Sequence, residues 1–593
     1  MNILGYSGLH SAINFRKGYY SDFTEQEYRM CQGLDSAACI LVDNQLIAAV
    51  EEERFNGEKY TCQFPINAIN FCLKKAGLTL SDLDFICHGF NYEPYHALFL
   101  TTQDSCVYYQ QVLDKCLQID LWQNHFSGKF VSNKFVSVDH HLAHAATAYY
   151  PSQFDSALVL IADGIGEMHS LSLFSAENKK INLLKNYNVF SSLGILYSQI
   201  TAHLGFHVNS DEYKVMGLAP YGDKKRYQQL FNEVIEYRDQ GQIFIKKFKL
   251  NTTEIDRQTG RGFRKWLSEN FFAPRTLESP ITQQHKDLAA TLQNTLEEAL
   301  LHILSFWQEK TGLKKLCMAG GVALNCTANG NLLRKALFKD IYIQPAASDA
   351  GTAIGAAMVQ AQQKGITLPR MSPFDLPYFG PDFHEIDYKK AIEKFGDQIT
   401  SKEFSVSDVV KEAAKWIINR KIIAWMQDRM EFGPRALGNR SILADPTDPN
   451  MRDRINLLVK QRESFRPFAP SVKVEKAHHY FDIPHGREFP HMLYTVPVKE
   501  EYKSIFPAIT HVDGSARIQT VNRHYAEKYW LLLDAVEQLS GIPLVLNTSF
   551  NMRGQPIVCT PEEAIKTLIS AKLDALFMGN FLITVNYQMP VYQ

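Results

Sequence analysis

The chain has 593 residues, 45% of them apolar and 21% charged, and its net charge is −1. This composition is that of a globular protein of about two to four domains, without the basic excess that favours nucleic acid or an anionic membrane surface. The ten cysteines form no C-x-x-C pair, which argues against zinc ribbons, thioredoxin-like chemistry and a secreted disulfide framework. We find neither a signal peptide nor an apolar stretch long enough to span a bilayer, so we expect a cytoplasmic protein with reduced thiols.

Strand and helix patterns alternate along the chain, which indicates an α/β protein. A strand that reaches a glycine-containing turn and is followed by a hairpin is predicted twice. The predicted strands lie at residues 3–5, 38–42 and 46–50, and again at 158–161, 171–174 and 181–183. Such a duplicated unit is typical of two-lobed actin-like ATPases, which clasp a nucleotide between their lobes.

Further along, helices are predicted around residues 287–310 and 351–363. Prolines then recur at Pro369, Pro373, Pro377 and Pro381, a density that stiffens a connector rather than filling a core. We therefore expect a first domain at 1–367, a proline-rich linker at 368–385 and a second α/β domain at 386–593. Strands of the second domain are predicted at 422–425, 543–546 and 575–578, and a helix start at Thr560.

Two histidines between the repeated units have the spacing of metal ligands. His140 and His144 are four apart, so on a helix of about 3.6 residues per turn they lie on one face. Asp163 and Asp349 each follow an apolar strand, and two imidazoles with two carboxylates can form an open transition-metal site. Alternatively, His140 caps a helix and His144 is a satisfied core histidine.

Two glycine-containing segments could bind a nucleotide. Gly320 and Gly321 lie between a strand and a helix, where backbone N–H groups can approach an anion and where Asn325 could bind a sugar or base. Lys214 and Gly217 could hold phosphates. A tight strand–helix turn needs glycine as well, and the segment containing Lys214 could be a solvated surface loop.

The second domain is rich in cations beside apolar segments. Arginines and lysines recur within residues 432–441, 460–468 and 514–517, and residues 546–551 offer short polar side chains after a strand. Arginine binds phosphate bidentately whereas lysine acts as a point charge, so a small phosphorylated ligand suits this group, although surface salt bridges explain many such arginines. Walker A, G-x-G-x-x-G, H-E-x-x-H and G-x-S-x-G motifs are missing from the chain.

Together these segments resemble the O-carbamoyltransferase family, which includes nodulation-factor, cephamycin, aminoglycoside and saxitoxin-type carbamoyltransferases. The matching segments lie in order at residues 51–55, 140–146, 214–222, 320–325, 348–351, 432–441, 465–470 and 547–551. The resemblance implies a first domain similar to the tRNA threonylcarbamoyl transferase of the actin-like ATPase superfamily. It implies a second domain similar to the YrdC domain that makes threonylcarbamoyl-adenylate.

The resemblance also implies a two-step reaction. Carbamoyl phosphate and ATP would give carbamoyl-adenylate in the second domain, and a substrate hydroxyl would take the carbamoyl group in the first domain while AMP leaves. Carried over by position, the iron-binding residues would be His140, His144, Asp163 and Asp349. The carbamoyl phosphate and adenylate site would comprise Arg435, Lys460, Arg466, Arg517, Asn547 and Ser549. The co-substrates implied are ATP and carbamoyl phosphate, with Mg²⁺ and with Fe²⁺ or another divalent transition metal.

One departure from the family pattern concerns the base for the acceptor hydroxyl. Where the family often has His-Asp-x-Ala-Ala, this chain has Leu34 in the histidine position, followed by Asp35. His10 is the nearest substitute as base; Asp35 could serve instead or could orient His10, and a structural role for His10 is equally open. An insertion at about residues 14–32 precedes this tract, and we expect it to shape the acceptor pocket.

The favoured hypothesis is therefore a cytoplasmic, ATP-dependent O-carbamoyltransferase for a hydroxyl of a small natural product in toxin or antibiotic biosynthesis. The alternatives are a tRNA threonylcarbamoyl-modifying enzyme, which near-zero charge disfavours, and a nucleotide-regulated scaffold of the actin type, which the cationic second domain disfavours. We expect neither nucleic-acid nor membrane partners, and the sequence leaves a homodimer open. A guanidinium alkaloid, an aminoglycoside sugar and a macrolactam hydroxyl remain open as acceptors, as do iron, manganese and zinc as the metal.

Overall fold

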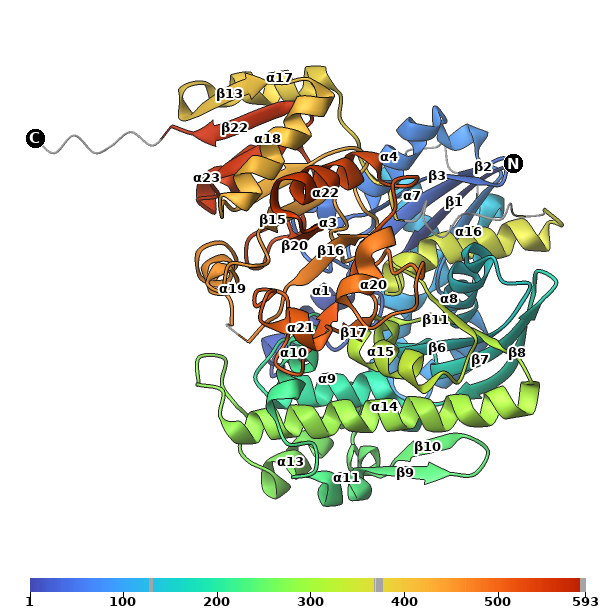
Figure 1. Ribbon diagram of the computed structural model, residues 1–593. Helices are drawn as coiled ribbons and strands as arrows, with labels where there is room; N and C mark the ends of the chain where they lie inside the picture. The colour runs from blue at the N-terminus through green and yellow to red at the C-terminus, as the bar shows by residue number, and fades with distance from the viewer. Residues whose placement is uncertain (127–131, 367, 369–376, 464, 587–593) are drawn as a thin grey trace, which may run out of the picture. The chain divides into compact units, whose positions relative to one another are not determined.

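A computed structural model describes residues 1–126, 132–366, 368, 377–463 and 465–586 (Figure 1). The chain divides into two compact units, Met1–Asn56 with Tyr60–Pro373 and Gly57–Lys59 with Phe374–Gln593. Both units combine sheets with helices, which confirms the α/β prediction. The predicted domain boundaries stay a prediction, because residues 369–376 of the expected linker lie outside the described residues.

The first unit contains two five-stranded sheets with the same topology. Their strand orders are β3-β2-β1-β4-β5 and β8-β7-β6-β11-β12. In each sheet the first strand pairs antiparallel with the next strand of a hairpin and parallel with a later strand. The strands are β1 (Asn2–Ser7), β2 (Ala37–Val42), β3 (Gln45–Glu51), β4 (Phe85–His88), β5 (Phe135–Ser137), β6 (Ser156–Gly166), β7 (His169–Glu177), β8 (Lys180–Tyr187), β11 (Lys315–Ala319) and β12 (Asp340–Ile343). This duplication is the two-lobed actin-like architecture that the repeated sequence pattern predicts.

Two helices of small residues pack closely at the centre of the first unit. Helix α16 (Thr352–Gln363) contacts both α8 (His140–Tyr149) and strand β1. A Cβ atom built on Gly355 would lie 1.8 Å from the carbonyl oxygen of Ala143, so only glycine permits this approach. The contact brings the start of α8 near the residues that precede α16.

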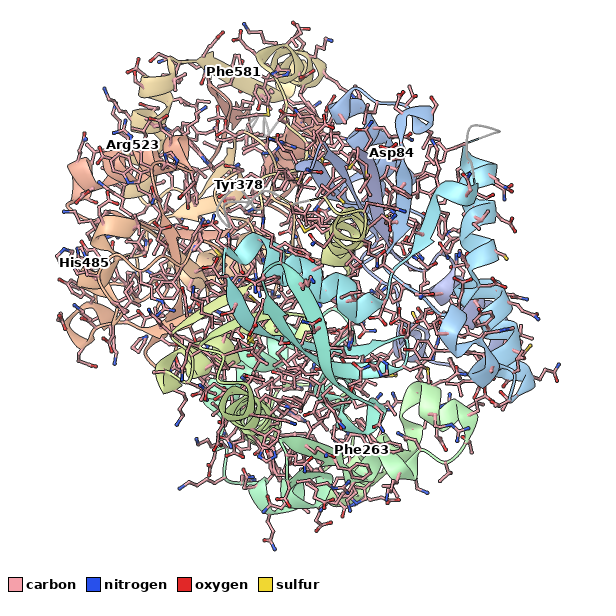
Figure 2. The ribbon with its side chains drawn as sticks, turned by 90° about the vertical axis from the view of Figure 1, so that its right-hand side faces the viewer. Asp84, Phe263, Tyr378, His485, Arg523 and Phe581 are labelled. Carbon is pink, nitrogen blue, oxygen red and sulfur yellow. The ribbon has the colours of Figure 1, made fainter. Side chains whose placement is uncertain are left out.

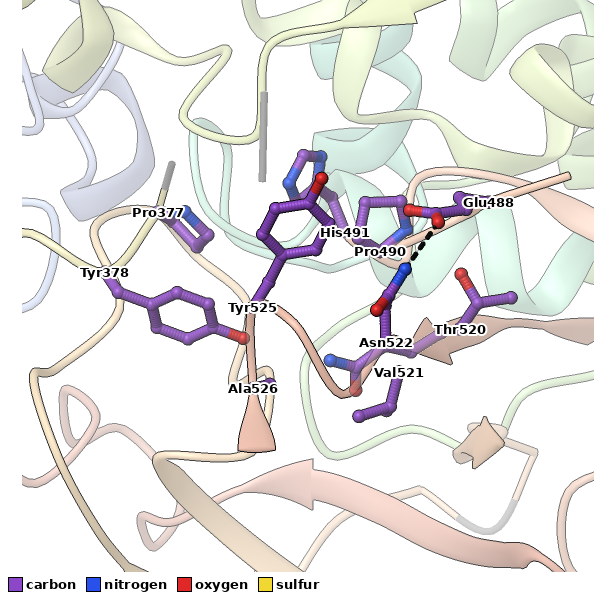
Figure 3. Close-up of a pocket in the computed structure, with 11 residues that line it drawn as sticks. Pro377, Tyr378, Glu488, Pro490, His491, Thr520, Val521, Asn522, Tyr525 and Ala526 are labelled. Carbon is purple, nitrogen blue, oxygen red and sulfur yellow. Dashed lines mark hydrogen bonds between the residues drawn. The ribbon is translucent and has the colours of Figure 1, made fainter. Parts of the chain in front are cut away.

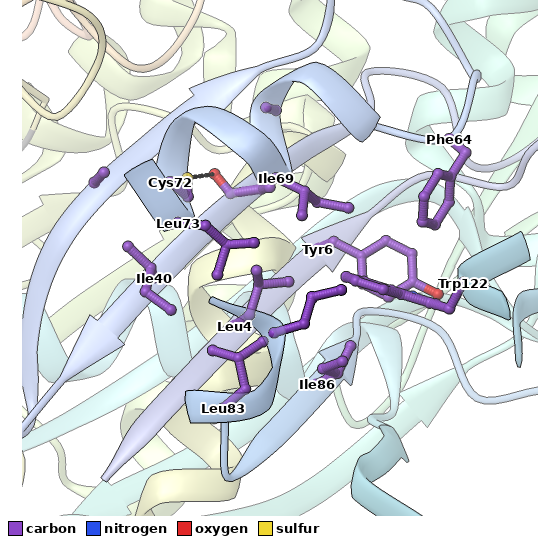
Figure 4. Packing of buried hydrophobic residues seen from close by; sticks show 14 of the residues in the cluster. Leu4, Tyr6, Ile40, Phe64, Ile69, Cys72, Leu73, Leu83, Ile86 and Trp122 are labelled. Atoms are coloured by element: carbon purple, nitrogen blue, oxygen red, sulfur yellow. Dashed lines mark hydrogen bonds between the residues drawn. The ribbon is translucent and has the colours of Figure 1, made fainter. Parts of the chain in front are cut away.

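A hydrophobic core beside the first sheet stabilises the N-terminal strand β1. Apolar side chains of β1, β2 and β4 pack against helix α4 (Ile66–Ala76) and Trp122 (Figure 4). At the start of β1 the Asn2 backbone N–H donates to Asp84 Oδ2 at 2.8 Å. Asp84, which immediately precedes β4, is labelled in Figure 2. Burial at about 25 cal/mol per Å² of apolar surface makes such a core the main stabilising contribution.

The other helices of the first unit surround these sheets. They are α1 (Ala12–Tyr19), α2 (Glu25–Tyr28), α3 (Glu53–Asn56), α5 (His96–Phe99), α6 (Gln103–Tyr108), α7 (Lys115–His125), α9 (Leu193–His203), α10 (Glu212–Leu218), α11 (Gln228–Val234), α12 (Glu254–Thr259), α13 (Arg261–Asn270), α14 (Gln283–Thr311) and α15 (Cys326–Lys335). A small sheet pairs β9 (Ile235–Arg238) with β10 (Gln242–Ile245). Helices α14 and α16 confirm the predictions at 287–310 and 351–363.

The second unit is built on one eight-stranded mixed sheet. Its order is β13-β22-β21-β14-β15-β20-β16-β19. The strands are β13 (Ile399–Glu403), β14 (Ile423–Met426), β15 (Arg440–Ala444), β16 (Ala469–Lys473), β19 (Gln519–Val521), β20 (Leu544–Ser549), β21 (Ala575–Met578) and β22 (Phe581–Val585), with a separate hairpin of β17 (Thr495–Pro497) and β18 (Ser515–Arg517). Strands β14, β20 and β21 confirm the three strands predicted for this region.

Helices of the second unit cover the sheet, and α18 and α22 share its main hydrophobic cluster. They are α17 (Glu385–Phe395), α18 (Val406–Ile418), α19 (Met451–Arg454), α20 (Ala477–Tyr480), α21 (Glu500–Lys503), α22 (Glu527–Ser540) and α23 (Pro561–Ser570). The predicted helix start is confirmed, because Thr560 caps α23 and forms a capping box with Glu563.

Part of the proline-rich segment, at Pro377 and Pro381, forms hydrogen bonds with the second unit. The Pro377 carbonyl accepts from the Phe432 N–H at 2.6 Å, and the Pro381 carbonyl accepts from the Met430 N–H at 2.9 Å and from Arg440 Nη2 at 3.0 Å. A proline lacks an N–H group but keeps its carbonyl, so this stretch can still dock on the second unit. Among the described residues, no helix combines the length and apolar character needed to cross a bilayer.

Candidate functional site

Helix α8 carries both predicted histidine ligands. Asp139 is its N-cap, and the Asp139 side chain accepts from the Leu142 N–H at 2.9 Å. His140 is therefore the first helical residue, and the interpretation of His140 as the helix cap is wrong. His140 and His144 lie one turn apart on the same face, and both are fully buried.

Four side chains converge on one point in the first unit. The Nε2 atoms of the two histidines are 3.1 Å apart. Asp163 Oδ2 lies 3.5 Å from Nε2 of His140 and 3.8 Å from that of His144. The corresponding distances from Asp349 Oδ1 are 3.6 and 3.9 Å. All four ligand atoms lie within 4.8 Å of one another, as the sequence predicts.

Hydrogen bonds outside the cluster orient its members. The Gly89 carbonyl lies 2.9 Å from Nδ1 of His140; because a carbonyl can only accept, Nδ1 donates this hydrogen bond and Nε2 is the nitrogen that faces the cluster. Asp163 Oδ1 accepts from the N–H groups of Gly164 at 2.8 Å and Gly321 at 3.2 Å. That arrangement leaves the other oxygen, Oδ2, directed at the histidines.

The charges of the cluster are strongly coupled. Burial alone would lower the pKa of His140, but the carboxylates of Asp349 and Asp163 outweigh it and raise that pKa well above its usual value. Burial and the charge of His140 together lower the pKa of His144. Burial raises the pKa of Asp349, whereas the histidines lower that of Asp163 in spite of its burial. Two buried carboxylates so placed require positive charge between them.

A divalent metal ion fits this donor set. Metal–nitrogen and metal–oxygen bonds of about 2.0–2.2 Å place neighbouring ligand atoms about 3–3.5 Å apart, close to the separations within the cluster. Among the described residues, Nδ1 of His144 has no hydrogen-bond partner, so His144 is not a satisfied core histidine. The carboxylate side chains are 12% and 21% exposed, which leaves one side open to a substrate.

Asp35 lies beside this cluster. Its Oδ2 accepts from Ser348 Oγ at 2.5 Å, and Ser348 immediately precedes Asp349. Burial, followed by the charges of Glu53 and Glu51, raises the pKa of Asp35 to about 8. Arg54 bonds both glutamates, at 3.0 Å to Glu51 Oε1 and 2.7 Å to Glu53 Oε1. A carboxyl with such a pKa can act as a base near neutral pH.

His10 has a different environment. Its Nδ1 accepts from the Phe64 N–H at 3.1 Å, and burial followed by the charge of His125 lowers its pKa. The neutral ring is therefore favoured, with Nε2 as its protonated nitrogen in that contact. Its role as base stays a prediction.

The glycine-containing segments are engaged within the protein. The Gly320 N–H donates to the Ala347 carbonyl at 2.9 Å, and the Gly321 N–H approaches the carboxylate of Asp163 rather than an external anion. Asn325 caps helix α15 and exchanges hydrogen bonds with Gln293 at 2.9 and 3.1 Å. Their nucleotide-binding role stays a prediction.

Lys214 and Gly217 lie in helix α10, so the surface-loop interpretation of this segment is wrong. The residues before Pro220 are mostly compatible with a helix, and one glycine does not break it. Both residues are buried, and Lys214 Nζ forms an ion pair with Asp211 at 2.9 Å. A phosphate-binding role for them stays a prediction.

Direct contacts in the second unit join two of its predicted site residues, Lys460 and Ser549. Lys460 is buried, and its ammonium donates to Asn551 Oδ1 at 2.8 Å and to the Asn551 carbonyl at 2.9 Å. It also lies 3.3 Å from Ser549 Oγ. Burial, then the charges of Arg462 and Arg466, lowers the pKa of Lys460 well below its usual value. Among the described residues Lys460 has no carboxylate partner, so an anionic ligand would stabilise its charged form.

Asn547 lies in strand β20 and contacts the residue that follows Arg435. Asn547 Nδ2 donates to Ser471 Oγ at 3.0 Å, to Gln519 Oε1 at 3.1 Å and to the Ala436 carbonyl at 3.5 Å. Within the described part of the chain, Nε of the neighbouring Arg435 has no hydrogen-bond partner although it is buried. Arg517 ends β18, two residues before Gln519.

A pocket in the second unit adjoins this network through Gln519. Tyr378, His491 and Tyr525 give it aromatic walls, and at its rim Asn522 donates to Glu488 at 2.7 Å (Figure 3). Tyr378 Oη and Gln519 Nε2 both donate to the Leu437 carbonyl, at 3.1 and 2.8 Å. The pocket wall is thus tied to the segment that carries Arg435.

Comparison with known families covers most of the chain. A model described as Carbamoyltransferase N-terminus matches residues 32–358, and one described as Carbamoyltransferase C-terminus matches residues 414–585. The chain belongs to the carbamoyltransferase family. This enzyme is 41% identical to nodulation protein NolNO of Sinorhizobium fredii over 93% of its own length and 78% of that protein. It is also 38% identical to an uncharacterized Synechocystis protein, over 93% and 95% of the two chains.

Solved structures resemble part of the chain only distantly. Component A of (R)-2-hydroxyglutaryl-CoA dehydratase from Acidaminococcus fermentans is 13% identical with a TM-score of 0.32, over 62% of this chain and 99% of that one. Full-length HypF in its phosphate- and nucleotide-bound form is 11% identical with a TM-score of 0.30, over 62% and 56%.

Several residues that surround the sites of this carbamoyltransferase were not predicted from the sequence. Ser348 lies beside a predicted ligand, and Asn551 follows the predicted Ser549 by two residues. The run of acids that contains Glu51 and Glu53 ends a buried strand, a place where charged residues are uncommon. Acidic residues at the end of an apolar strand are the sequence signal that could have identified Glu51 and Glu53.

Proposed function

We propose that this carbamoyltransferase performs ATP-dependent O-carbamoylation of a small polar molecule through carbamoyl-adenylate. The second unit, resembling the YrdC domain, would form the adenylate, and the first unit would transfer its carbamoyl group to a hydroxyl. The observation that carries the proposal is the presence of two chemically distinct sets of residues. One surrounds a buried lysine that has no carboxylate partner among the described residues, and the other joins two imidazoles with two carboxylates.

In the activation step, carbamoyl phosphate loses its phosphate to water. The resulting carbamate oxygen attacks the α-phosphorus of ATP, and pyrophosphate leaves. Lys460, Arg435 and Arg466 would neutralise the phosphate charges, with Mg²⁺ bound to ATP. Because the charged form of Lys460 is disfavoured without an anion, phosphate binding and lysine protonation would reinforce each other. Asn547, Ser549 and Arg517 would orient the nucleotide and the acyl group.

In the transfer step, the acceptor hydroxyl attacks the carbamoyl carbon, the bond to the adenylate phosphate breaks, and AMP leaves. His140, His144, Asp163 and Asp349 would hold a divalent metal, Fe²⁺ in the family resemblance. When bound, such a metal supplies positive charge that stabilises a phosphate or polarises a carbonyl. Asp35 accepts the hydroxyl proton, with His10 as the alternative base.

The relatives and the charge support one acceptor class. The similar proteins include nodulation proteins of rhizobia, and the net charge of −1 lacks the basic excess that favours tRNA binding. We therefore favour a small hydroxyl-bearing natural product. The insertion at residues 14–32 is the segment that would adapt the enzyme to its acceptor.

Incubation with ATP, carbamoyl phosphate and a panel of hydroxyl acceptors tests the proposal. Mass spectrometry should detect one added carbamoyl group on an acceptor together with AMP. We expect Arg435→Ala to abolish carbamoyl-phosphate-dependent pyrophosphate release, because the variant loses one of the three cations proposed to neutralise the phosphate charges. His144→Ala should retain that release and lose transfer.

Arg523→Ala is a matched control for the arginine variant, since Arg523 is exposed in the same unit and bonds only Glu527 at 3.3 Å among the contacts described. It should leave both half-reactions unchanged. Loss of the same half-reaction in Arg435→Ala and His144→Ala would contradict the division of labour. Strong, salt-dependent tRNA binding would favour a tRNA-modifying enzyme instead.

A further inference from the structure

The hairpin turn between β6 and β7 places a glutamate in an unusual conformation. Glu167 lies four residues beyond Asp163 and has a φ of 44°, in the left-handed region that non-glycine residues seldom occupy. Its side chain is buried, with the residue 2% exposed. A residue held in that conformation needs compensating contacts, and Glu167 has them through its carboxylate.

One oxygen of this carboxylate joins two segments of the first unit. Glu167 Oε1 accepts from the backbone N–H of His140 at 3.0 Å and from that of Asn91 at 2.8 Å. The first N–H groups of a helix have no partner within it, so Glu167 satisfies the donor at the first residue of α8. The same oxygen ties the start of α8 to the loop that follows β4.

That loop in turn holds the imidazole ring of His140. The Gly89 carbonyl accepts from Nδ1 at 2.9 Å, and the Phe90 ring stacks on the imidazole with centroids 4.1 Å apart and planes 16° apart. The backbone of His140 and the loop that orients its ring are thus both anchored to one carboxylate. The direction of Nε2 therefore depends on the contacts made by Glu167, the Gly89 carbonyl and the Phe90 ring.

We propose that Glu167 is a positioning residue that fixes the metal ligand His140, an inference that rests on the proposed metal site of the first unit. Glu167 touches neither the cluster nor a substrate through its side chain; it acts through the backbone of His140 and through Asn91. Its own carbonyl accepts from Gln32 Nε2 at 3.4 Å, while the Tyr92 hydroxyl donates to Gln32 Oε1. The turn therefore also connects the metal site with the insertion that precedes Asp35.

Titration of the full-length, metal-stripped protein with cobalt(II), followed by the visible spectrum of the bound ion, tests the proposal. Loss of an outer contact of a metal ligand typically weakens metal affinity about 10- to 100-fold. We expect this loss of cobalt affinity, together with an altered cobalt spectrum, for Glu167→Ala and Glu167→Asp. The shorter Asp side chain cannot reach the N–H groups of both His140 and Asn91. Glu167→Gln keeps an accepting oxygen and should bind cobalt nearly as the parent protein does.

Glu177→Ala, at the exposed end of strand β7, is the matched control and should not change cobalt binding. His144→Ala should abolish it. If Glu167→Ala does not fold, Glu167→Asp carries the test. Parent-like affinity and spectrum in the Ala and Asp variants would overturn the inference, as would an equal loss in Glu167→Gln. A parent protein that binds no cobalt would overturn the proposed metal site itself, a result distinct from the others.

Discussion

At the scale of single residues, the environment of Asp35 predicts the pH dependence of transfer. Burial and two neighbouring glutamates raise the pKa of Asp35 to about 8. A protonated carboxyl cannot accept a proton, so its activity as a base appears as the pH rises through that value. We expect the transfer rate, measured with preformed carbamoyl-adenylate, to increase between about pH 7 and 9 and then level off.

Asp35→Asn should lose this increase and most of the transfer rate, while pyrophosphate release in the second unit continues. His10→Gln is the comparison, because the two residues are the alternative bases. An unchanged pH profile in Asp35→Asn, combined with its loss in His10→Gln, would assign the base to His10.

Site residues are predictable from the sequence where their relation is a short spacing within one element. His140 and His144 were predictable because one helical turn separates them, and a four-residue spacing is visible in any sequence. Asp163 and Asp349 are predicted at strand ends, but Asp163 lies within β6 where its pairing with β7 is irregular, and Asp349 begins a 3-10 turn after β12. Only the fold shows their separations from the histidines. The contact of Glu167 with His140 crosses from a hairpin to a helix start, and no local pattern encodes a side-chain bond to a distant backbone N–H.

At the scale of elements, one buried ion cluster attaches the insertion to helix α13. Glu27, in α2, bonds Arg261 at 2.9 and 3.0 Å and also pairs with Arg264. Burial alone would raise the pKa of Glu27, but the hydrogen bonds and charges of the two arginines outweigh it and lower the pKa to about 2. A lowered carboxyl pKa stabilises the contact above about pH 4.5, and this stability is lost as the pH falls toward 2.

We therefore expect Glu27→Gln to destabilise the insertion locally by about 2–3 kcal/mol at pH 7. Faster hydrogen exchange in residues 20–32 would measure it, and the difference between parent and variant should shrink in acid. Glu25→Gln is the matched control, since Glu25 is exposed and pairs only with the exposed Lys17 among the described contacts. Equal exchange in Glu27→Gln and the parent would contradict the anchoring role.

Elements with strong local signals were predicted well. The capping residues before α23 predict that helix, and helices are also predicted at α14 and α16. The surface-loop interpretation of the segment with Lys214 misses helix α10, in which Lys214 is buried and forms an ion pair with Asp211. Tertiary packing overrides weak propensity at such positions.

At the scale of the whole molecule, the repeated strand–turn–hairpin pattern revealed the two lobes of the first unit. Strand order within each sheet could not be read from that pattern, because the parallel partners β4 and β11 lie far from β1 and β6 in sequence. For the second unit, a resemblance suggested the function, while the mixed eight-stranded order emerged only from the structure. Pairings between distant segments are the part of a fold that local periodicity leaves undetermined.

Removal of metal should affect the two half-reactions differently, because the proposed metal ligands all belong to the first unit. We expect chelation, followed by removal of the chelator and resupply of Mg²⁺ for ATP, to abolish carbamoyl transfer and to leave carbamoyl-phosphate-dependent pyrophosphate release intact. A metal that binds only the folded protein stabilises it by about 2.7 kcal/mol at one hundred times its Kd, so chelation should also lower the thermal unfolding temperature. Adding Fe²⁺, Mn²⁺ or Zn²⁺ separately would show which ion restores transfer. In His144→Ala, chelation should not lower the unfolding temperature, and no added ion should restore transfer. Full transfer by metal-free protein would contradict a catalytic metal. The carboxylates of the cluster would then be balanced by a protonated His140 alone.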